Sequence, residues 1–307
     1  PGPTQSVSQT RPPVNPTQSS SQSVNPTQGS SQATSKPKKS YPTGTVIISP
    51  KGPWVELERI LNDEASLLLS KHKELGYEVP IGFYWEIKIL KDQDTFMKET
   101  GAGRFTMATC APLNSVKGEK GQGVKVTTGF PCMIKAFPNE TLEQTLVHEM
   151  SHAILWSHYG DGPDFMLEGI GDWYKLQKPF VTPESMKVFK EKLAVNIEYL
   201  KKFEKKHMEI FLTSNYYDGW ELLFGENDVW RGYNLSTALI DMLYKYPQSR
   251  DMFVTAIHNS ANKTEFGKSR GLIMIGELET AWKGDLMMLK KGWISHANTL
   301  LGKPPRK

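Results

Sequence analysis

The sequence predicts an α+β domain with a small mixed sheet in its N-terminal half and helices in its C-terminal half. A disordered N-terminal tail precedes this domain. Three observations lead to this fold class. Residues 1–43 are mainly Ser, Gln, Thr, Pro and Asn, with almost nothing apolar to bury. Short β-type segments dominate from about 44 to 138, and helical periodicity dominates from 139 to about 295. We therefore expect one folded domain over 44–307.

The predicted tail carries a repeated decapeptide. Residues 14–23, V-N-P-T-Q-S-S-S-Q-S, return as V-N-P-T-Q-G-S-S-Q-A at 24–33. A segment of this composition stays disordered, and its prolines keep it extended. Stalks of this kind often join an exported domain to a membrane or wall anchor. We therefore expect a secreted, periplasmic or cell-surface protein; the alternative is a cytosolic linker.

The first half of the domain contains alternating and β-branched segments. We expect strands at 45–49, 83–90, 104–110, 123–128 and 131–136, a helix that begins at Pro53, and a short helix at 92–99. Cys110 and Cys132 are the only cysteines. They are compatible with one disulfide between neighbouring strands or with two buried thiols.

The second half is predicted to be helical throughout. Asn139 is a suitable N-cap for the first of these helices. The expected helices span 140–157, 165–177, 183–204, 234–246, 250–259 and 276–291.

The most informative motif is H-E-M-S-H, which holds His148, Glu149 and His152 within the predicted helix 140–157. Histidines four residues apart lie on one helix face with their Cβ atoms about 6 Å apart, so both can bind one zinc ion. Glu149 then points at the open side of the ion, where it can take a proton from a water that the metal activates. The motif therefore predicts a Zn²⁺ cofactor and hydrolysis with Glu149 as general base.

Glu168 is the candidate for a third ligand, because two histidines and one carboxylate form a common catalytic zinc site. Asp172 shares its helix face and can accept the remaining N–H of a ligating histidine. Gly169 and Gly171 would each weaken an isolated helix by about 1 kcal/mol. We expect them to let this helix approach the histidine helix closely. The alternative is a Glu/Asp pair on a solvated face, with the glycines marking a turn.

His158 is a competing third ligand, since the metzincin pattern H-E-x-x-H-x-x-G-x-x-H has a histidine at this offset. That pattern needs glycine where this chain has Leu155, so that the chain can turn out of the helix. If the helix continues instead, His158 is rotated about 240° from His152 and cannot reach the ion. We therefore favour Glu168.

These residues resemble a known family. The spacing of the H-E-x-x-H motif and the later E-x-x-x-D is similar to the gluzincin branch of zinc peptidases. More narrowly, L-V-H-E-M-S-H-A (146–153) and F-M-L-E-G-I-G-D-W-Y (165–174) resemble the peptidase MA-like and plant basic secretory protein families. In these families an E-G-x-A-D/E stretch carries the third ligand; here Gly171 replaces the alanine. Residues 230–243 and 277–282 are also similar to the helical half of such domains.

The resemblance covers roughly residues 80–290, although only 148–173 is specific. It implies a zincin-like fold and hydrolysis of peptide bonds in a peptide or protein substrate. The G-x-M-E-N amine anchor of the aminopeptidase relatives is absent from the sequence, which argues against exopeptidase action. We expect an endopeptidase.

Two further roles follow from this chemistry. An extended substrate can add to an exposed sheet edge, and residues 123–136 are the best candidate for that edge. Gluzincins usually place a Tyr or His donor opposite the glutamate, where negative charge develops. Tyr233 is our first choice for this donor, with Arg231 beside it. The alternatives are Tyr159, Tyr217 and His258.

Composition limits the remaining possibilities. The four basic residues of 1–43 account for the whole formal net charge of +4, so the rest of the chain is balanced and no nucleic-acid partner is expected. No apolar run approaches the 18 residues that span a membrane. We expect a monomer. A surface binding module that keeps the fold without turnover is the alternative function, but a binder has no use for Glu149 as a base.

Overall fold

The computed structural model describes residues 41–76, 79–102, 106–112, 115–116, 125–126, 132–159, 162–178, 180–214, 217–262, 270–281 and 285–303. All of them fall within the unit Ser40–Lys307. The predicted tail lies outside these residues except for 41–43.

A four-stranded sheet forms the core of the N-terminal half, as predicted. Its order is β1 (Thr45–Ser49), β2 (Tyr84–Ile89), β6 (Cys132–Ala136) and β3 (Ala108–Pro112). The first three strands are parallel, and β3 pairs antiparallel with β6. Ile87 lies opposite Ile48 on one side and Ile134 on the other, so apolar residues line up on one face. The predicted mixed sheet is therefore confirmed.

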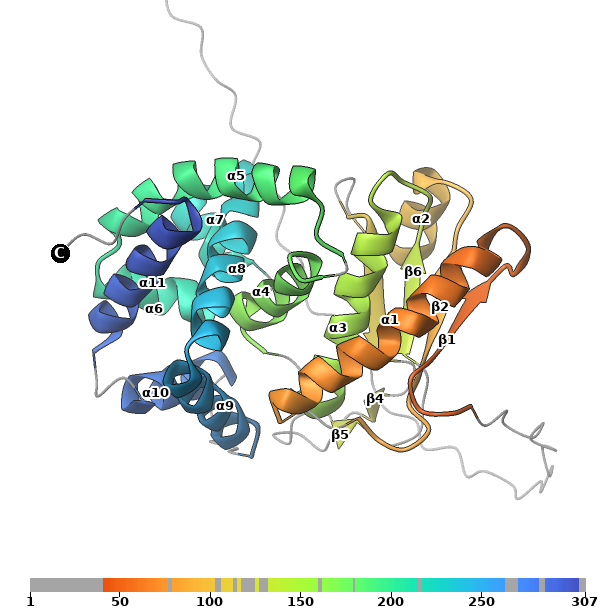
Figure 1. The fold of residues 1–307 in the computed structure, drawn as a ribbon, viewed down its shortest axis with the longest axis horizontal. Helices are drawn as coiled ribbons and strands as arrows, with labels where there is room; N and C mark the ends of the chain where they lie inside the picture. The colour runs from red at the N-terminus through yellow and green to blue at the C-terminus, as the bar shows by residue number, and fades with distance from the viewer. Residues whose placement is uncertain are drawn as a thin grey trace, which may run out of the picture. The chain divides into compact units, whose positions relative to one another are not determined.

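Helices lie on both faces of this sheet (Figure 1). The apolar face is covered by α1 (Val55–Glu74), which follows a short turn at Gly52–Trp54, and by α3 (Leu142–Tyr159). The other face is polar. There Glu99 of α2 (Gln93–Thr100) forms ion pairs with Lys88 at 2.8 Å and Lys135 at 3.7 Å.

The prediction that residues 123–136 form an exposed sheet edge is wrong for β6. This strand lies inside the sheet, between β2 and β3. Residues 125–126 form a second, two-stranded sheet, in which β5 (Lys125–Val126) pairs with β4 (Ser115–Val116). Strand β6 pairs with β2 on one side and with the antiparallel β3 on the other. Strand β3 is therefore the edge of the four-stranded sheet, and it lies next to α3.

The C-terminal half is helical, as predicted, and α8 lies in its middle with α4, α5, α9 and α11 packed around it (Figure 1). The helices are α4 (Asp164–Lys175), α5 (Pro183–Lys202), α6 (Lys205–Thr213), α7 (Asp218–Phe224), α8 (Trp230–Lys245), α9 (Pro247–Asn262), α10 (Arg270–Ala281) and α11 (Leu286–Leu300), with a 3-10 turn at Glu226–Asp228. Among the described helices, none has an apolar stretch long enough to cross a membrane.

Local sequence signals explain several helix boundaries. Asn139, the predicted cap, accepts a hydrogen bond from the Thr141 amide at 2.9 Å in the turn before α3, but the helix itself begins only at Leu142. Thr182 caps α5 by accepting from the Ser185 amide at 3.0 Å.

Other boundaries differ from the prediction. The predicted helix 276–291 is wrong as one helix, since α10 ends at Ala281 and Asp285 caps α11. Helices α6 and α7 were not predicted, and α8 begins four residues earlier than expected. Strand β3 begins at Ala108, so the predicted strand 104–110 is displaced toward the C-terminus.

Candidate metal centre

Helix α3 places both histidines of the H-E-x-x-H motif on the side that faces α4. Its opposite side, including Leu146, Met150 and Ile154, is buried in the core against the sheet. The Trp85 indole of β2 donates to the Met150 carbonyl oxygen at 3.1 Å and fixes α3 on the sheet. The imidazole rings of His148 and His152 are buried, with centroids 4.5 Å apart.

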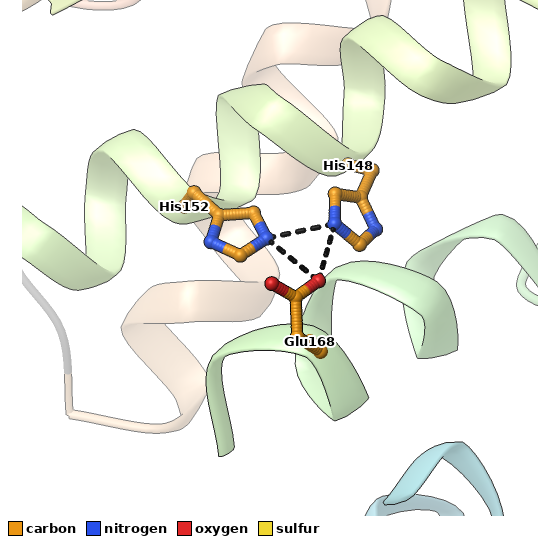
Figure 2. Close-up of side chains that lie close together, drawn as sticks. All are labelled: His148, His152 and Glu168. Carbon is orange, nitrogen blue, oxygen red and sulfur yellow. Dashed lines mark hydrogen bonds and ion pairs between the residues drawn. The ribbon is translucent and has the colours of Figure 1, made fainter. Parts of the chain in front are cut away.

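Three donor atoms from α3 and α4 converge on one point (Figure 2). The two Nε2 atoms are 2.7 Å apart, and Glu168 Oε2 lies 3.0 Å from His148 Nε2 and 3.5 Å from His152 Nε2. Ligand atoms of a tetrahedral zinc lie about 3.3 Å apart, because each bond to zinc is about 2.0–2.1 Å. The spacing of these buried donors therefore fits a metal ion of this kind.

The second ring nitrogen of His148 is engaged by a carboxylate. His148 Nδ1 lies 2.9 Å from Asp172 Oδ1, and the same oxygen is 2.7 Å from Lys175 Nζ. With a carboxylate partner, Nδ1 carries the proton and the Nε2 lone pair points at Glu168 and His152. Lone pairs of one histidine and a carboxylate then face a common space, and a proton or a metal cation placed there relieves their repulsion. This is the arrangement expected for Asp172 behind a metal ligand.

The ionisation of these groups follows from the same contacts. Burial and Lys175 disfavour the imidazolium, but hydrogen bonds to Asp172 and Glu168 outweigh them and raise the pKa of His148 to about 9. Burial alone would raise the pKa of Glu168, whereas the two histidines hold it well below its usual range. The pKa of Asp172 is likewise lowered, because Lys175 and His148 overcome its burial. Both carboxylates are therefore charged near neutral pH.

The two glycines of α4 serve different neighbours. A Cβ at Gly171 would lie 2.7 Å from His148 Nδ1, so this glycine lets the histidine ring pack on the α4 backbone, as predicted. A Cβ at Gly169 would instead lie 2.8 Å from Ile240 Cγ1 and 3.0 Å from Ser236 Cβ of α8. Gly169 therefore permits close packing on α8 rather than on the histidine helix.

The second oxygen of Glu168 faces away from the histidines into a pair of tyrosines. The Tyr217 hydroxyl donates to Glu168 Oε1 at 2.7 Å, and the Tyr233 hydroxyl donates to the Tyr217 oxygen at 2.7 Å. Burial, followed by the nearby Glu168 charge, raises the pKa of both tyrosines, so they remain protonated donors.

A cavity of about 890 Å³ opens beside the donor cluster. Its walls include Thr106–Cys110 at the β3 edge and Glu149 on α3. On the side of α8 they include Glu226, Asn227, Val229 and Trp230. Glu149 is half-buried, and its carboxylate forms no hydrogen bond or ion pair within the described part of the chain. It is therefore available to a molecule in the cavity.

All six residues predicted for the site line this one cavity: His148, Glu149, His152, Glu168, Asp172 and Tyr233. Tyr217, one of the alternatives for the oxyanion donor, lines it as well. Nothing in the local sequence around Tyr217 signals its contact with Glu168.

The remaining candidates have other surroundings or lie outside the described side chains. Arg231 binds Asp228 and Asn196 instead. The His258 ring packs beside Gly76 and is not part of the cavity wall. Helix α3 runs through Leu155 to Tyr159, which confirms that the chain does not turn where a His158 ligand requires it. The side chains of His158, Tyr159 and Cys132 are not among those that the structure describes, so the choice between a disulfide and two thiols at Cys110 and Cys132 stays untested.

Comparison of the chain with family models, with curated proteins and with solved structures gave no match. The resemblance to gluzincins therefore depends on the motif residues themselves and stays a prediction.

Proposed function

We propose that this chain is a zinc-dependent peptidase of the gluzincin type that acts as an exported endopeptidase. The observation that carries the proposal is the convergence of His148 Nε2, His152 Nε2 and Glu168 Oε2 next to an open cavity that also holds Glu149. A buried group of two histidines and one carboxylate could instead bind a metal for structural reasons. The unengaged Glu149 carboxylate in the cavity favours a catalytic role.

His148, His152 and Glu168 would hold the zinc ion, which would supply Lewis-acid activation of a water nucleophile. Glu149 accepts the proton of that water on its carboxylate and passes it to the leaving amine. Tyr233 turns its hydroxyl from Tyr217 toward the substrate and donates to the carbonyl oxygen, where negative charge develops. Asp172 keeps the His148 ring in the tautomer that presents Nε2.

The substrate is proposed to bind along β3. This strand is the edge of the four-stranded sheet, and residues 106–110 border the cavity beside Glu149. Main-chain groups at a sheet edge bind an extended peptide largely independently of its sequence. A peptide added there would cross the donor cluster in the middle of its length, which supports internal cleavage.

Cleavage of a mixed peptide pool tests the proposal. The zinc-loaded full-length protein should cut peptides at internal positions, and a chelator should abolish the cleavage until zinc is added back. Zinc-loaded Glu149→Gln is the matched control for contaminating peptidases, because it keeps the three donors. Absence of cleavage by a fully zinc-loaded, folded protein across a diverse pool would favour the binding-module alternative.

A further inference from the structure

We propose that Tyr217 is a positioning residue that holds Glu168 to one-oxygen metal binding, and that Asp164 fixes the backbone of Tyr217 for this purpose. The inference rests on the proposed metal site and adds a part that the motif does not contain. Tyr217 lies outside both motif helices, 49 residues after Glu168 in the chain.

The two oxygens of Glu168 have different partners. Oε2 faces both histidine Nε2 atoms at 3.0 and 3.5 Å, whereas Oε1 accepts the Tyr217 hydroxyl at 2.7 Å. A carboxylate whose second oxygen is held in this way presents a single oxygen to a cation. Without the tyrosine, both oxygens can turn toward the same ion.

The backbone of Tyr217 is held in a conformation that a tyrosine rarely adopts. Its φ is 65° and its ψ is 0°, in the left-handed region, and no other non-glycine residue in the described segments has a positive φ. Such a conformation persists only where the surroundings enforce it, and it is concentrated at functional sites. Here it occurs at the residue whose hydroxyl reaches Glu168.

Asp164, the first residue of α4, holds Tyr217 in this left-handed conformation. Its Oδ2 accepts hydrogen bonds from the Tyr217 amide at 2.8 Å and from the Ser214 hydroxyl at 2.7 Å. Its own amide donates to the Ser214 carbonyl oxygen at 2.8 Å. The carboxylate is buried, so these bonds are shielded from water. Asp164 therefore links the start of α4 to the segment that carries Tyr217, while Glu168 lies one turn further along the same helix.

The ring of Tyr217 is also fixed from the side of α8. It stacks on Tyr233 with centroids 5.7 Å apart and lies 5.9 Å from the Trp220 ring. Trp220 packs directly on the α8 backbone at Gly232, where a Cβ would lie 2.2 Å from the indole. Contacts to the backbone and to the ring of Tyr217 thus together direct its hydroxyl toward Glu168.

Zinc affinity of the full-length protein, measured by competition with a chromophoric chelator, tests the inference. Tyr217→Phe should weaken zinc binding about 10- to 100-fold, the usual effect of losing a partner of a metal ligand. Tyr233→Phe is the matched control, because it removes one hydroxyl from the same network but leaves the bond from Tyr217 to Glu168. Its zinc affinity should equal that of the parent.

A spectroscopic measurement separates positioning from general damage. The visible absorption of the Co²⁺-loaded protein weakens as the coordination number rises. Release of Glu168 Oε1 in Tyr217→Phe should therefore lower the absorption per bound ion, whereas a merely loosened fold would leave it unchanged. An unaltered spectrum together with an unaltered zinc affinity would overturn the role of Tyr217.

The role of Asp164 is tested by a double-mutant cycle. Asp164→Ala removes the acceptor of both bonds, so it should weaken zinc binding in the parent and cause little further loss in the Tyr217→Phe background, because Asp164 acts through Tyr217. Equal losses in both backgrounds would contradict this. Far-ultraviolet circular dichroism and melting temperature identify a variant that has failed to fold. If the parent itself binds no zinc, the proposed function fails. If the parent binds zinc and Tyr217→Phe changes neither the zinc affinity nor the Co²⁺ spectrum, only this inference fails.

Discussion

The two helices that meet at the donor cluster position their side chains in different ways. On α3, the regular helix and its packing on the sheet bring His148, Glu149 and His152 to the site. On α4, Glu168 is held by contacts from distant segments, through Tyr217 and the neighbouring Tyr233. The α3 wall of the site is therefore set by the periodicity of one helix, whereas the opposite wall, formed by α4 and its neighbours, is set by contacts between distant segments. Substitutions on the two walls should differ in their effects.

The largest effect is expected on the α3 wall, from Glu149→Gln. The carboxylate has no partner among the described residues, so the nearly isosteric amide should leave the fold and zinc content intact. Peptidase activity should fall by about 10²- to 10⁴-fold, as for the loss of a general base. Steady-state rates and zinc content need to be measured on the same samples. Full activity in this variant would remove Glu149 from the mechanism.

A smaller effect is expected on the opposite wall, from Tyr233→Phe. If Tyr233 stabilises the charge on the substrate oxygen, activity should fall by roughly 10²- to 10³-fold with zinc retained. The loss should appear in kcat as well as in kcat/KM, because the interaction forms only in the transition state. A variant with unchanged kcat would point to Tyr217 as the donor instead.

The contact between the two walls is tested by Gly171→Ala. Alanine favours a helix, but its Cβ would lie 2.7 Å from His148 Nδ1 and must displace the ring or separate the helices. Zinc affinity should fall by about 10-fold or more, comparable to the loss of a partner of a ligand.

Gly276→Ala on α10 is the matched control, since a Cβ there meets no atom within 4 Å. It should keep zinc affinity and raise the free energy of unfolding by about 1 kcal/mol. Unchanged zinc binding in Gly171→Ala would mean that α3 and α4 can adjust to a methyl group.

The smallest effects are expected where the domain begins. Removing residues 1–40 should leave activity and melting temperature unchanged, because this tract has little apolar surface. Removing 1–43 should lower the free energy of unfolding by about 1–2 kcal/mol, since Tyr41 packs on the Tyr84 ring at 4.7 Å and Thr43 accepts from the Gly82 amide at 2.8 Å. Chemical denaturation of both shortened chains decides it. A destabilised 1–40 deletion would show that the tract contributes to the folded domain.

The same contrast explains how far the sequence could predict the site. Helical spacing predicts that His148 and His152 share a face of α3 and that Asp172 shares a face of α4 with Glu168. Glu168 itself was inferred from the carboxylate that a zinc site with two histidines requires, and all four residues line one cavity. The contact of Tyr217 with Glu168 could not be predicted, because it depends on a left-handed residue outside the helices and on a buried carboxylate 53 residues away.

The fold shows a similar limit. Amphipathic periodicity predicted the strands β1, β2 and β6 and most helices to within a few residues. It could not predict that β6 inserts between β2 and β3, because strand order is set by pairing between distant segments and not by local pattern. The sheet edge that borders the cavity was consequently assigned to the wrong strand.

Elemental analysis of the purified full-length protein and two variants tests the central claim most directly. The parent should hold one zinc per chain through His148, His152 and Glu168. Glu168→Ala should lose it, whereas His158→Ala should keep it, because α3 continues past Leu155 instead of turning. Loss of the metal from His158→Ala with retention in Glu168→Ala would contradict the account.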